Sequence, residues 1–195
     1  MGGFEFIMDS LVTAAAEYND SKIRDSTLTE STGMDQNTTD YKHLALRLIE
    51  EEHTMTLATA GAQGPWAAPV YYIFLDGAFY FFSSPASRHI EEAFDARRAS
   101  VAISAQAFSW QEIRGLQMSG AVTAVPPGPG ALRAIRVYLE KFPFTRDFFK
   151  PSDLLDLNAF TTRFRVKLYR FEPDLVYYLD NSIRFGFRER VTLKD

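Results

Sequence analysis

The stretch from Ala67 to Ser83 contains the feature that most limits how this chain can fold. Two aromatic and β-branched segments, VYYIFL and AFYFF, are separated only by Asp76 and Gly77. Asp-Gly is favoured in two-residue hairpin turns, where both central residues take positive φ angles that match the twist of the flanking strands. We therefore expect two strands, Ala67–Leu75 and Ala78–Ser83, that pair antiparallel.

The rest of the chain repeats this pattern of short alternating segments between turn residues. Further strands are expected at Met55–Thr59, Ser100–Ala107, Glu112–Val125, Arg163–Phe171, Leu175–Leu179 and Arg188–Leu193. A helical period predicts helices over Tyr41–Ile49, Pro85–Asp95 and Leu132–Phe142. Six or seven strands joined mostly by hairpins, with two or three peripheral helices, indicate a mainly β fold of the small antiparallel barrel type.

Composition narrows the classes of function. The chain has no cysteine, which excludes disulfides, thiolate nucleophiles and cysteine-ligated metals and fits a reducing cytoplasm. No basic run alternates with aromatic residues, so nucleic-acid binding is not indicated. No apolar stretch approaches the roughly 20 residues of a membrane span, and the acidic N-terminus does not resemble a signal peptide. We expect a cytoplasmic protein.

The beginning of the chain differs in composition from the remainder. Residues 1–40 carry eight acidic and two basic side chains and are rich in Ser and Thr with little hydrophobic periodicity. Such a composition does not support a packed core. We expect a flexible acidic arm at 1–38 and one folded domain at 39–195. Translation that begins at Met34 is an alternative explanation of the arm.

The segment FFSSPASRHI, which follows the predicted hairpin, combines a helix start with anion-binding side chains. Ser84 followed by Pro85 is typical of a helix N-cap and first helical position. Capping alone leaves four polar residues unexplained: Ser83, Ser87, Arg88 and His89. A helix N-terminus with hydroxyls and a guanidinium beside it is suited to bind a phosphate group. The two interpretations are compatible, because a helix start directs its free N–H groups toward such an anion.

The order of these motifs resembles the FMN-binding split-barrel superfamily related to pyridoxamine 5'-phosphate oxidase. The resemblance covers about residues 41–125, from the first helix through the Asp-Gly hairpin and Ser-x-x-x-Ser-Arg to Trp-x-x-x-x-Gly-x-Gln-x-x-Gly. The ending YYLDNSIRFGFRERV resembles that of a small uncharacterised bacterial branch. The resemblance implies a split-barrel homodimer with FMN at the subunit interface and the phosphate held by one subunit.

The resemblance also assigns roles to individual positions. The candidate cofactor-binding residues are Pro69, Val70, Tyr71 and Tyr72 along the flavin edge, Ser83, Ser84, Ser87, Arg88 and His89 around the phosphate, and Trp110 and Gln117 toward the ring. Arg188, beside Phe185 and Gly186, is a further candidate outside the resemblance, to contact the flavin or a substrate anion. His89 stands where the oxidases usually have lysine. Ala68 and Ile73 replace an arginine and a lysine of the true oxidases, and their C-terminal Arg/His signature is absent, which argues against pyridoxamine phosphate as the substrate.

The function that these features predict is that of an FMN-binding flavoprotein of oxidoreductase type. The flavin would supply the redox chemistry, so no side chain is assigned as a general acid or base. One alternative is a non-catalytic split barrel that holds flavin or haem, with His43, His53 and His89 as the available axial ligands. A deazaflavin in place of FMN and a purely structural dimerisation module are two more. His53, after Glu50–Glu52, is interpreted as a helix end rather than a metal site.

Overall fold

The structure, a computed structural model, describes residues 40–148 and 165–194, so the predicted arm at 1–38 lies outside the described residues. The compact unit that contains them begins at Asp40. None of the described helices is long and apolar enough to cross a membrane.

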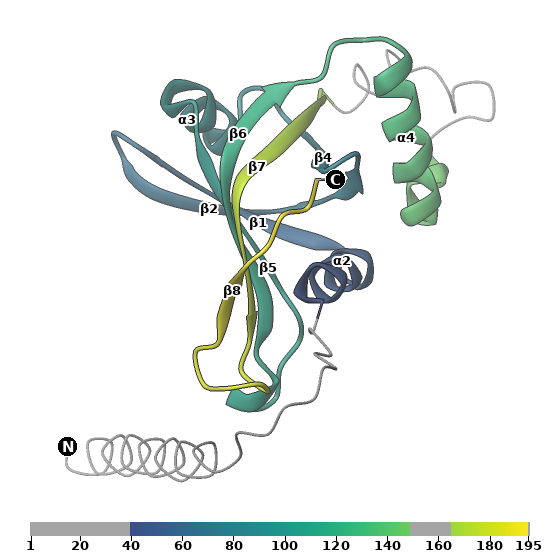
Figure 1. Ribbon diagram of the computed structural model, residues 1–195. Helices are drawn as coiled ribbons and strands as arrows, with labels where there is room; N and C mark the ends of the chain where they lie inside the picture. The colour runs from purple at the N-terminus through teal and green to yellow at the C-terminus, as the bar shows by residue number, and fades with distance from the viewer. Residues whose placement is uncertain (1–39, 149–164, 195) are drawn as a thin grey trace, which may run out of the picture. The chain divides into compact units, whose positions relative to one another are not determined.

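One curled antiparallel sheet forms the body of this unit (Figure 1). Its strands are β1 (Thr54–Gly61), β2 (Gly64–Tyr71), β3 (Ile73–Leu75), β4 (Ala78–Ser83), β5 (Ala99–Ser104), β6 (Arg114–Ala124), β7 (Lys167–Asp180) and β8 (Arg188–Arg190). The spatial order is β2-β1-β5-β6-β7-β4-β3, and β8 pairs with β7. With three α-helices around this sheet, the predicted mainly β fold is confirmed.

The Asp-Gly hairpin is confirmed in detail. Asp76 and Gly77 have φ angles of 51° and 75°, as a two-residue type I′ turn requires, and Leu75 pairs with Ala78. The prediction of one strand over Ala67–Leu75 is wrong, because the chain breaks between β2 and β3 at Tyr72. Tyr72 and Ile73 are both buried and belong to different apolar clusters, so simple alternation cannot continue through them.

The two strands predicted at Arg163–Phe171 and Leu175–Leu179 form one strand, β7, as far as the described residues extend. The two predicted strands leave residues 172–174 between them, and Pro173 among these cannot donate a ladder hydrogen bond. The strand continues because the opposite strand carries a bulge between Ser119 and Gly120, and Gly120 lies opposite Pro173. A bulge is where a sheet tolerates such an interruption.

Helix α2 begins at the predicted Tyr41, whereas α3 and α4 begin at different residues from those predicted. Helix α2 (Tyr41–Glu51) is capped by Asp40, whose carboxylate accepts a hydrogen bond of 3.1 Å from the His43 backbone N–H. Helix α3 (Arg88–Ala96) begins after the N-cap residue Ser87, so the predicted start at Ser84 and Pro85 is wrong. Helix α4 (Pro129–Lys141) has proline in its first turn and therefore begins before the predicted Leu132.

Two apolar clusters hold the helices on the sheet. The larger lies inside the curled sheet under α2 and α3, and the smaller lies between α4 and the β3–β4 hairpin and includes Ile73, Tyr138 and Phe142. Lys141 connects α4 to α2, since its ammonium group donates to the carbonyls of Glu52 at 2.8 Å and Ile49 at 3.2 Å. Burial lowers the pKa of Lys141 to about 8.

Candidate functional site

Two hydroxyls and an imidazole converge where β4 ends and α3 begins. The Ser83 hydroxyl lies 2.7 Å from His89 Nε2 and 3.1 Å from the Ser87 hydroxyl, and Ser87 Oγ lies 3.2 Å from His89 Nε2. Ser83 is the last residue of β4, and a turn at Ser84 returns the chain so that Ser87 can begin the helix. We call this group the Ser83–Ser87–His89 cluster.

The cluster leaves the helix start available to an anion. The Ser87 side chain does not cap the first turn of α3; it donates instead to the Ser84 carbonyl at 2.8 Å. The free N–H groups of a helix start carry a partial positive charge. Burial lowers the pKa of His89 below its ordinary value, and the nearby Glu92 carboxylate opposes this shift. The imidazole is therefore mostly neutral at pH 7, and an anion beside it would favour its protonated form.

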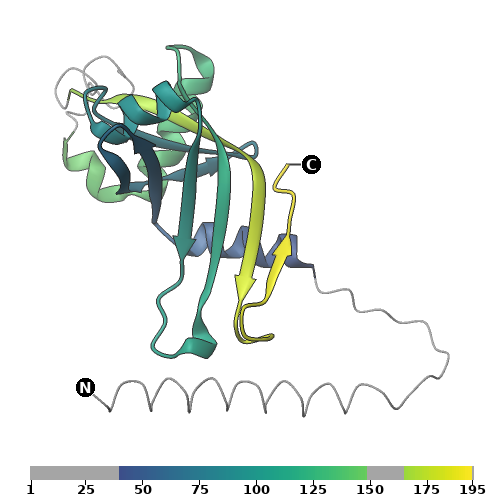
Figure 2. The same ribbon diagram turned by 90° about the vertical axis from the view of Figure 1, so that its left-hand side faces the viewer.

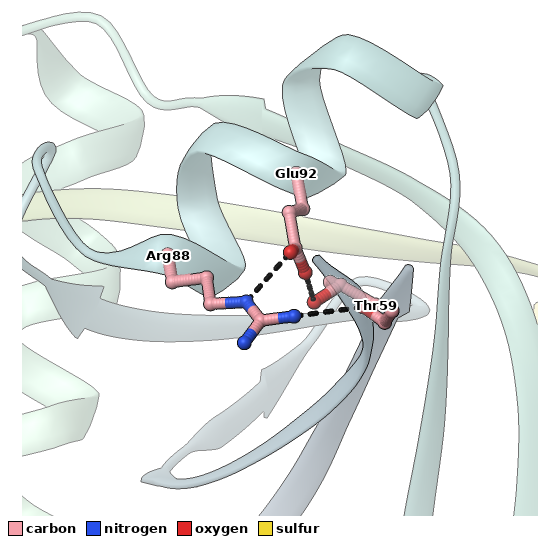
Figure 3. A network of polar contacts seen from close by, with 4 residues as sticks. Thr59, Arg88 and Glu92 are labelled. Atoms are coloured by element: carbon pink, nitrogen blue, oxygen red, sulfur yellow. Dashed lines mark hydrogen bonds and ion pairs between the residues drawn. The ribbon is translucent and has the colours of Figure 1, made fainter. Parts of the chain in front are cut away.

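The Arg88 side chain bonds to Glu92 and the β1–β2 hairpin, and none of the hydrogen bonds given for it within the described residues joins it to the Ser83–Ser87–His89 cluster (Figure 3). Its Nε donates to Glu92 at 2.7 Å, its Nη2 donates to the Gly64 carbonyl at 2.7 Å, and its guanidinium lies 4.8 Å from the Trp66 ring centre. Glu92 also accepts a hydrogen bond of 2.6 Å from the Thr59 hydroxyl. This network fastens α3 to the β1–β2 hairpin. Sequence reasoning missed it, although the i, i+4 spacing of Arg88 and Glu92 is a recognisable signal.

The contacts of Glu92 with Thr59 and Arg88 should stabilise the folded state at neutral pH and lose this effect in acid. Hydrogen bonds from Thr59 and Arg88 hold the pKa of Glu92 below its ordinary 4.5, so their stabilisation is present above that pH and is lost as the pH falls through the folded-state pKa. Thr59→Val should lower Tm by a few degrees at pH 7 and flatten the fall of Tm between pH 5 and 3. Thermal melts of Thr123→Val, an exposed threonine on β6 outside the network and outside the candidate site, serve as the control. Equal pH profiles in both variants would contradict this account.

The other candidate residues lie mainly on the outer face of the sheet. Cross-strand pairing aligns one row, Pro69, Thr56, Ala102, Gln117 and Tyr177, across five strands. Nine of the exposed residues of β1, β2, β5 and β6 on this face are small or uncharged: Thr54, Thr56, Ala60, Ala67, Pro69, Ser100, Ala102, Ser104 and Gln117. We call these nine residues the outer face.

Three more candidates border the outer face. Tyr71 is 47% exposed, with its ring centre 5.2 Å from Phe142 and 5.6 Å from Phe144. Arg188 lies on β8 with its guanidinium 5.7 Å from the Tyr177 ring centre. The resemblance places Trp110 on a strand that faces the ring, and this expectation is wrong. Trp110 lies instead in a 3-10 turn, η1 (Trp110–Glu112), just before β6.

The structure thus divides the predicted residues into two groups. Among the described residues, no hydrogen bond or ring contact joins the Ser83–Ser87–His89 cluster to Gln117 or Trp110. Val70 and Tyr72 turn their side chains inward, so only their backbone faces outward. Ser84 lies outside the cluster, where its hydroxyl accepts a bond of 3.3 Å from Ala86 N–H. Of the described residues, no three side chains are grouped as metal ligands would be.

A curled antiparallel sheet with a helix at the end of β4 defines this part of the chain as a split barrel. The family model described as "Pyridoxamine 5'-phosphate oxidase" matches residues 42–165, which is more than half of the chain. The chain therefore belongs to the pyridoxamine 5'-phosphate oxidase family, and the predicted resemblance is confirmed. No curated protein matches the chain.

Solved structures with different bound groups share the fold. A heme binding protein from Mycobacterium smegmatis is 20% identical, with a TM-score of 0.56 over 76% of this chain and 57% of that one. HutZ, a heme storage protein from Vibrio cholerae, is 19% identical, with a TM-score of 0.53 over 66% and 87%. An FAD-binding protein from Mesorhizobium loti is 19% identical, with a TM-score of 0.51 over 69% and 90%.

Proposed function

We propose that this chain is an FMN-binding flavoprotein that works as an oxidoreductase in the cytoplasm. The observation that carries the proposal is the Ser83–Ser87–His89 cluster at the start of α3. Two hydroxyls, an imidazole and the helix N–H groups can all donate to the oxygens of one phosphate. The donor set fits the phosphate end of FMN, and bound flavin would supply hydride or electron transfer.

A second copy of the chain would complete the site. The two groups of candidate residues are joined by no hydrogen bond or ring contact among the described residues of one copy. The outer face carries no charge on its nine residues, which favours burial against another protein surface. In the resulting homodimer, the cluster of one copy holds the phosphate, while Gln117, Trp110 and Arg188 of the partner copy border the ring.

The substrate is proposed to differ from pyridoxamine phosphate. Ala68 stands where the true oxidases have an arginine that also grips the phosphate, and its side chain is buried against β1 opposite Leu57. Ile73, in place of a lysine, lies in the apolar cluster under α4. Both positions therefore contribute packing rather than positive charge.

Haem is the second candidate, because two of the structural relatives are described as a heme binding and a heme storage protein. A haem would need an axial ligand, and His89 already lies in contact with two hydroxyls. His43 is exposed on α2, and His53 lies beside the ring of Phe142 at 5.8 Å. These positions make a haem site less well supported than a phosphate site.

One experiment tests both candidates. The purified full chain is incubated with FMN or with haem, separated from free cofactor by gel filtration, and examined by absorbance and light scattering. We expect retained flavin absorbance at one FMN per chain and the mass of a dimer. A Soret band without flavin retention would favour the haem protein, and a protein that retains neither would refute the proposal. Retention by a monomer would refute the shared site.

His89 predicts a pH dependence of FMN retention. The pKa of His89 is lowered in the free protein, and a phosphate dianion beside it favours the protonated imidazole. Above pH 7 the phosphate is fully charged, so FMN affinity should fall as the pH rises from 7 toward 9 and the bound imidazolium loses its proton. Glu92 and Arg88 also lie beside His89, so His89→Gln is the control. It should bind more weakly with a flat profile, and an unchanged slope would contradict the role of His89.

A further inference from the structure

Two loops at one end of the sheet present a concentrated apolar surface. The β5–β6 loop and the β7–β8 loop lie side by side beyond the strands in both views (Figures 1 and 2). They carry half of the ten large hydrophobic residues that are exposed in the described chain: Phe108, Trp110, Ile113, Ile183 and Phe185. Trp110 and Phe185 meet edge to face with ring centres 5.6 Å apart. We call these two rings the aromatic edge.

Asn181 ties the two loops together. Its side-chain N–H donates to the Trp110 carbonyl at 2.9 Å, and its backbone N–H donates to the Ile113 carbonyl at 3.0 Å. Its side-chain oxygen accepts from Gly186 N–H at 3.0 Å. Gly186 has a φ of 67°, a conformation that glycine adopts without strain. One asparagine side chain therefore links the segment before β6 to both ends of the turn that carries Phe185.

A buried carboxylate stabilises the same turn. Asp180 is 6% exposed and accepts hydrogen bonds from Tyr178 Oη at 2.8 Å, Ser182 N–H at 2.9 Å and Ser182 Oγ at 2.6 Å. These bonds hold the turn that begins at Asn181, whose side chain donates to the Trp110 carbonyl. A surface held in place this firmly loses little conformational entropy when it binds a partner.

The charges around the aromatic edge favour an anionic, planar occupant. Four arginines lie on the two loops or on the strands beside them: Arg114, Arg184, Arg188 and Arg190. None of them forms an ion pair within the described residues. The edge also continues the outer face, since Gly115 pairs with Leu179 and Arg114 with Asp180 just before the two loops. Arg184 and Arg188 lie over the rings of Phe187 and Tyr177. Three acidic residues, Glu112, Asp180 and Glu189, share the same loops and strands, so the formal charge at this edge is +1. Exposed rings with this small positive balance suit a flat anionic ring system.

We propose that Asn181 is a positioning residue that holds the aromatic edge against the flavin ring bound by a second copy of the chain. The inference rests on the proposed function and deepens it, because it gives the Asp180–Asn181 turn a role at the shared site. Asn181 acts through Trp110 and does not itself touch the cofactor.

The test uses Trp110 as its own reporter. The chain has two tryptophans, and Trp66→Phe leaves Trp110 as the single one while keeping an aromatic ring beside Arg88. In this background Asn181→Asp keeps the acceptor for Gly186 but replaces the donor to the Trp110 carbonyl with an oxygen. Ser182→Ala is the matched control, because it removes a bond inside the turn and none to the Trp110 segment.

We expect Trp110 emission to be quenched when FMN is loaded. FMN should dissociate about fivefold faster from Asn181→Asp than from the protein with Asn181, because one hydrogen bond to the Trp110 segment is lost. Acrylamide quenching of Trp110 in the cofactor-free protein should also rise in Asn181→Asp and stay unchanged in Ser182→Ala. A parallel change in the control would indicate general loosening of the turn and overturn the inference.

The remaining outcomes separate the inference from the proposed function. FMN retention with Trp110 emission unchanged on loading would overturn the inference and leave FMN binding intact. Retention with equal dissociation rates in wild type and Asn181→Asp would also overturn it. A protein that retains no FMN would overturn both, and the acrylamide measurement would then report only on the turn.

Discussion

Removing the Ser87 hydroxyl and the His89 imidazole together is expected to weaken FMN binding by at least about 100-fold. Each hydrogen bond to a charged group contributes about 1.5–3 kcal/mol, and about 1.4 kcal/mol corresponds to a tenfold change in affinity. The two side chains lie 3.2 Å apart and share Ser83 as a neighbour, so they would act on the same phosphate. The single variants Ser87→Ala and His89→Ala should each show a smaller loss.

Fluorescence titration of FMN with the cofactor-free variants measures this effect. Thr192→Ala, which removes an exposed hydroxyl near the C-terminus, is the matched control and should bind like the wild type. Circular dichroism and Tm establish that Ser87→Ala/His89→Ala is folded, which is expected because both side chains are only half-buried. A folded double variant that binds FMN within threefold of the wild type would place the phosphate elsewhere.

Gly120→Ala is expected to lower the free energy of unfolding by about 3 kcal/mol, at the upper end for overpacking. A Cβ at Gly120 would lie only 2.0 Å from the Glu172 carbonyl oxygen and 2.8 Å from Pro173 Cα. These are backbone atoms of the neighbouring strand, so no side chain can move aside to relieve the contact. The bulge between Ser119 and Gly120 would have to open, and with it the pairing of β6 and β7.

Urea unfolding followed by circular dichroism measures this loss. Gly130→Ala is the control, because nothing lies within 4 Å of the corresponding Cβ and alanine is a better helix former than glycine in α4. Its midpoint should equal or exceed that of the wild type. A Gly120→Ala protein within 1 kcal/mol of the wild type would mean that the two strands are farther apart than the structure has them.

Local patterns predicted the parts of the fold that depend on local physics. The hairpin at Asp76 and Gly77 follows from the φ angles that a two-residue turn requires, and the apolar stripe of α2 follows from helical periodicity. Predictions failed where a competing local turn or a neighbouring strand decides. Ser84 and Pro85 form a good helix start by themselves, yet α3 begins at Arg88, because Ser87 turns back onto the Ser84 carbonyl. Pro173 interrupts a strand by its own chemistry, and only the bulge at Gly120 lets β7 continue.

By itself, the sequence determined the split-barrel fold and the family, and it placed Ser83, Ser87, Arg88 and His89 within seven positions of one another as candidate residues. Only the tertiary structure decided what Arg88 and Asn181 contact. Arg88 turns to Glu92 and the β1–β2 hairpin, and Asn181 reaches Trp110, 71 positions away. Side-chain partners so distant along the chain are set by how the sheet curls, which no local pattern of residues encodes.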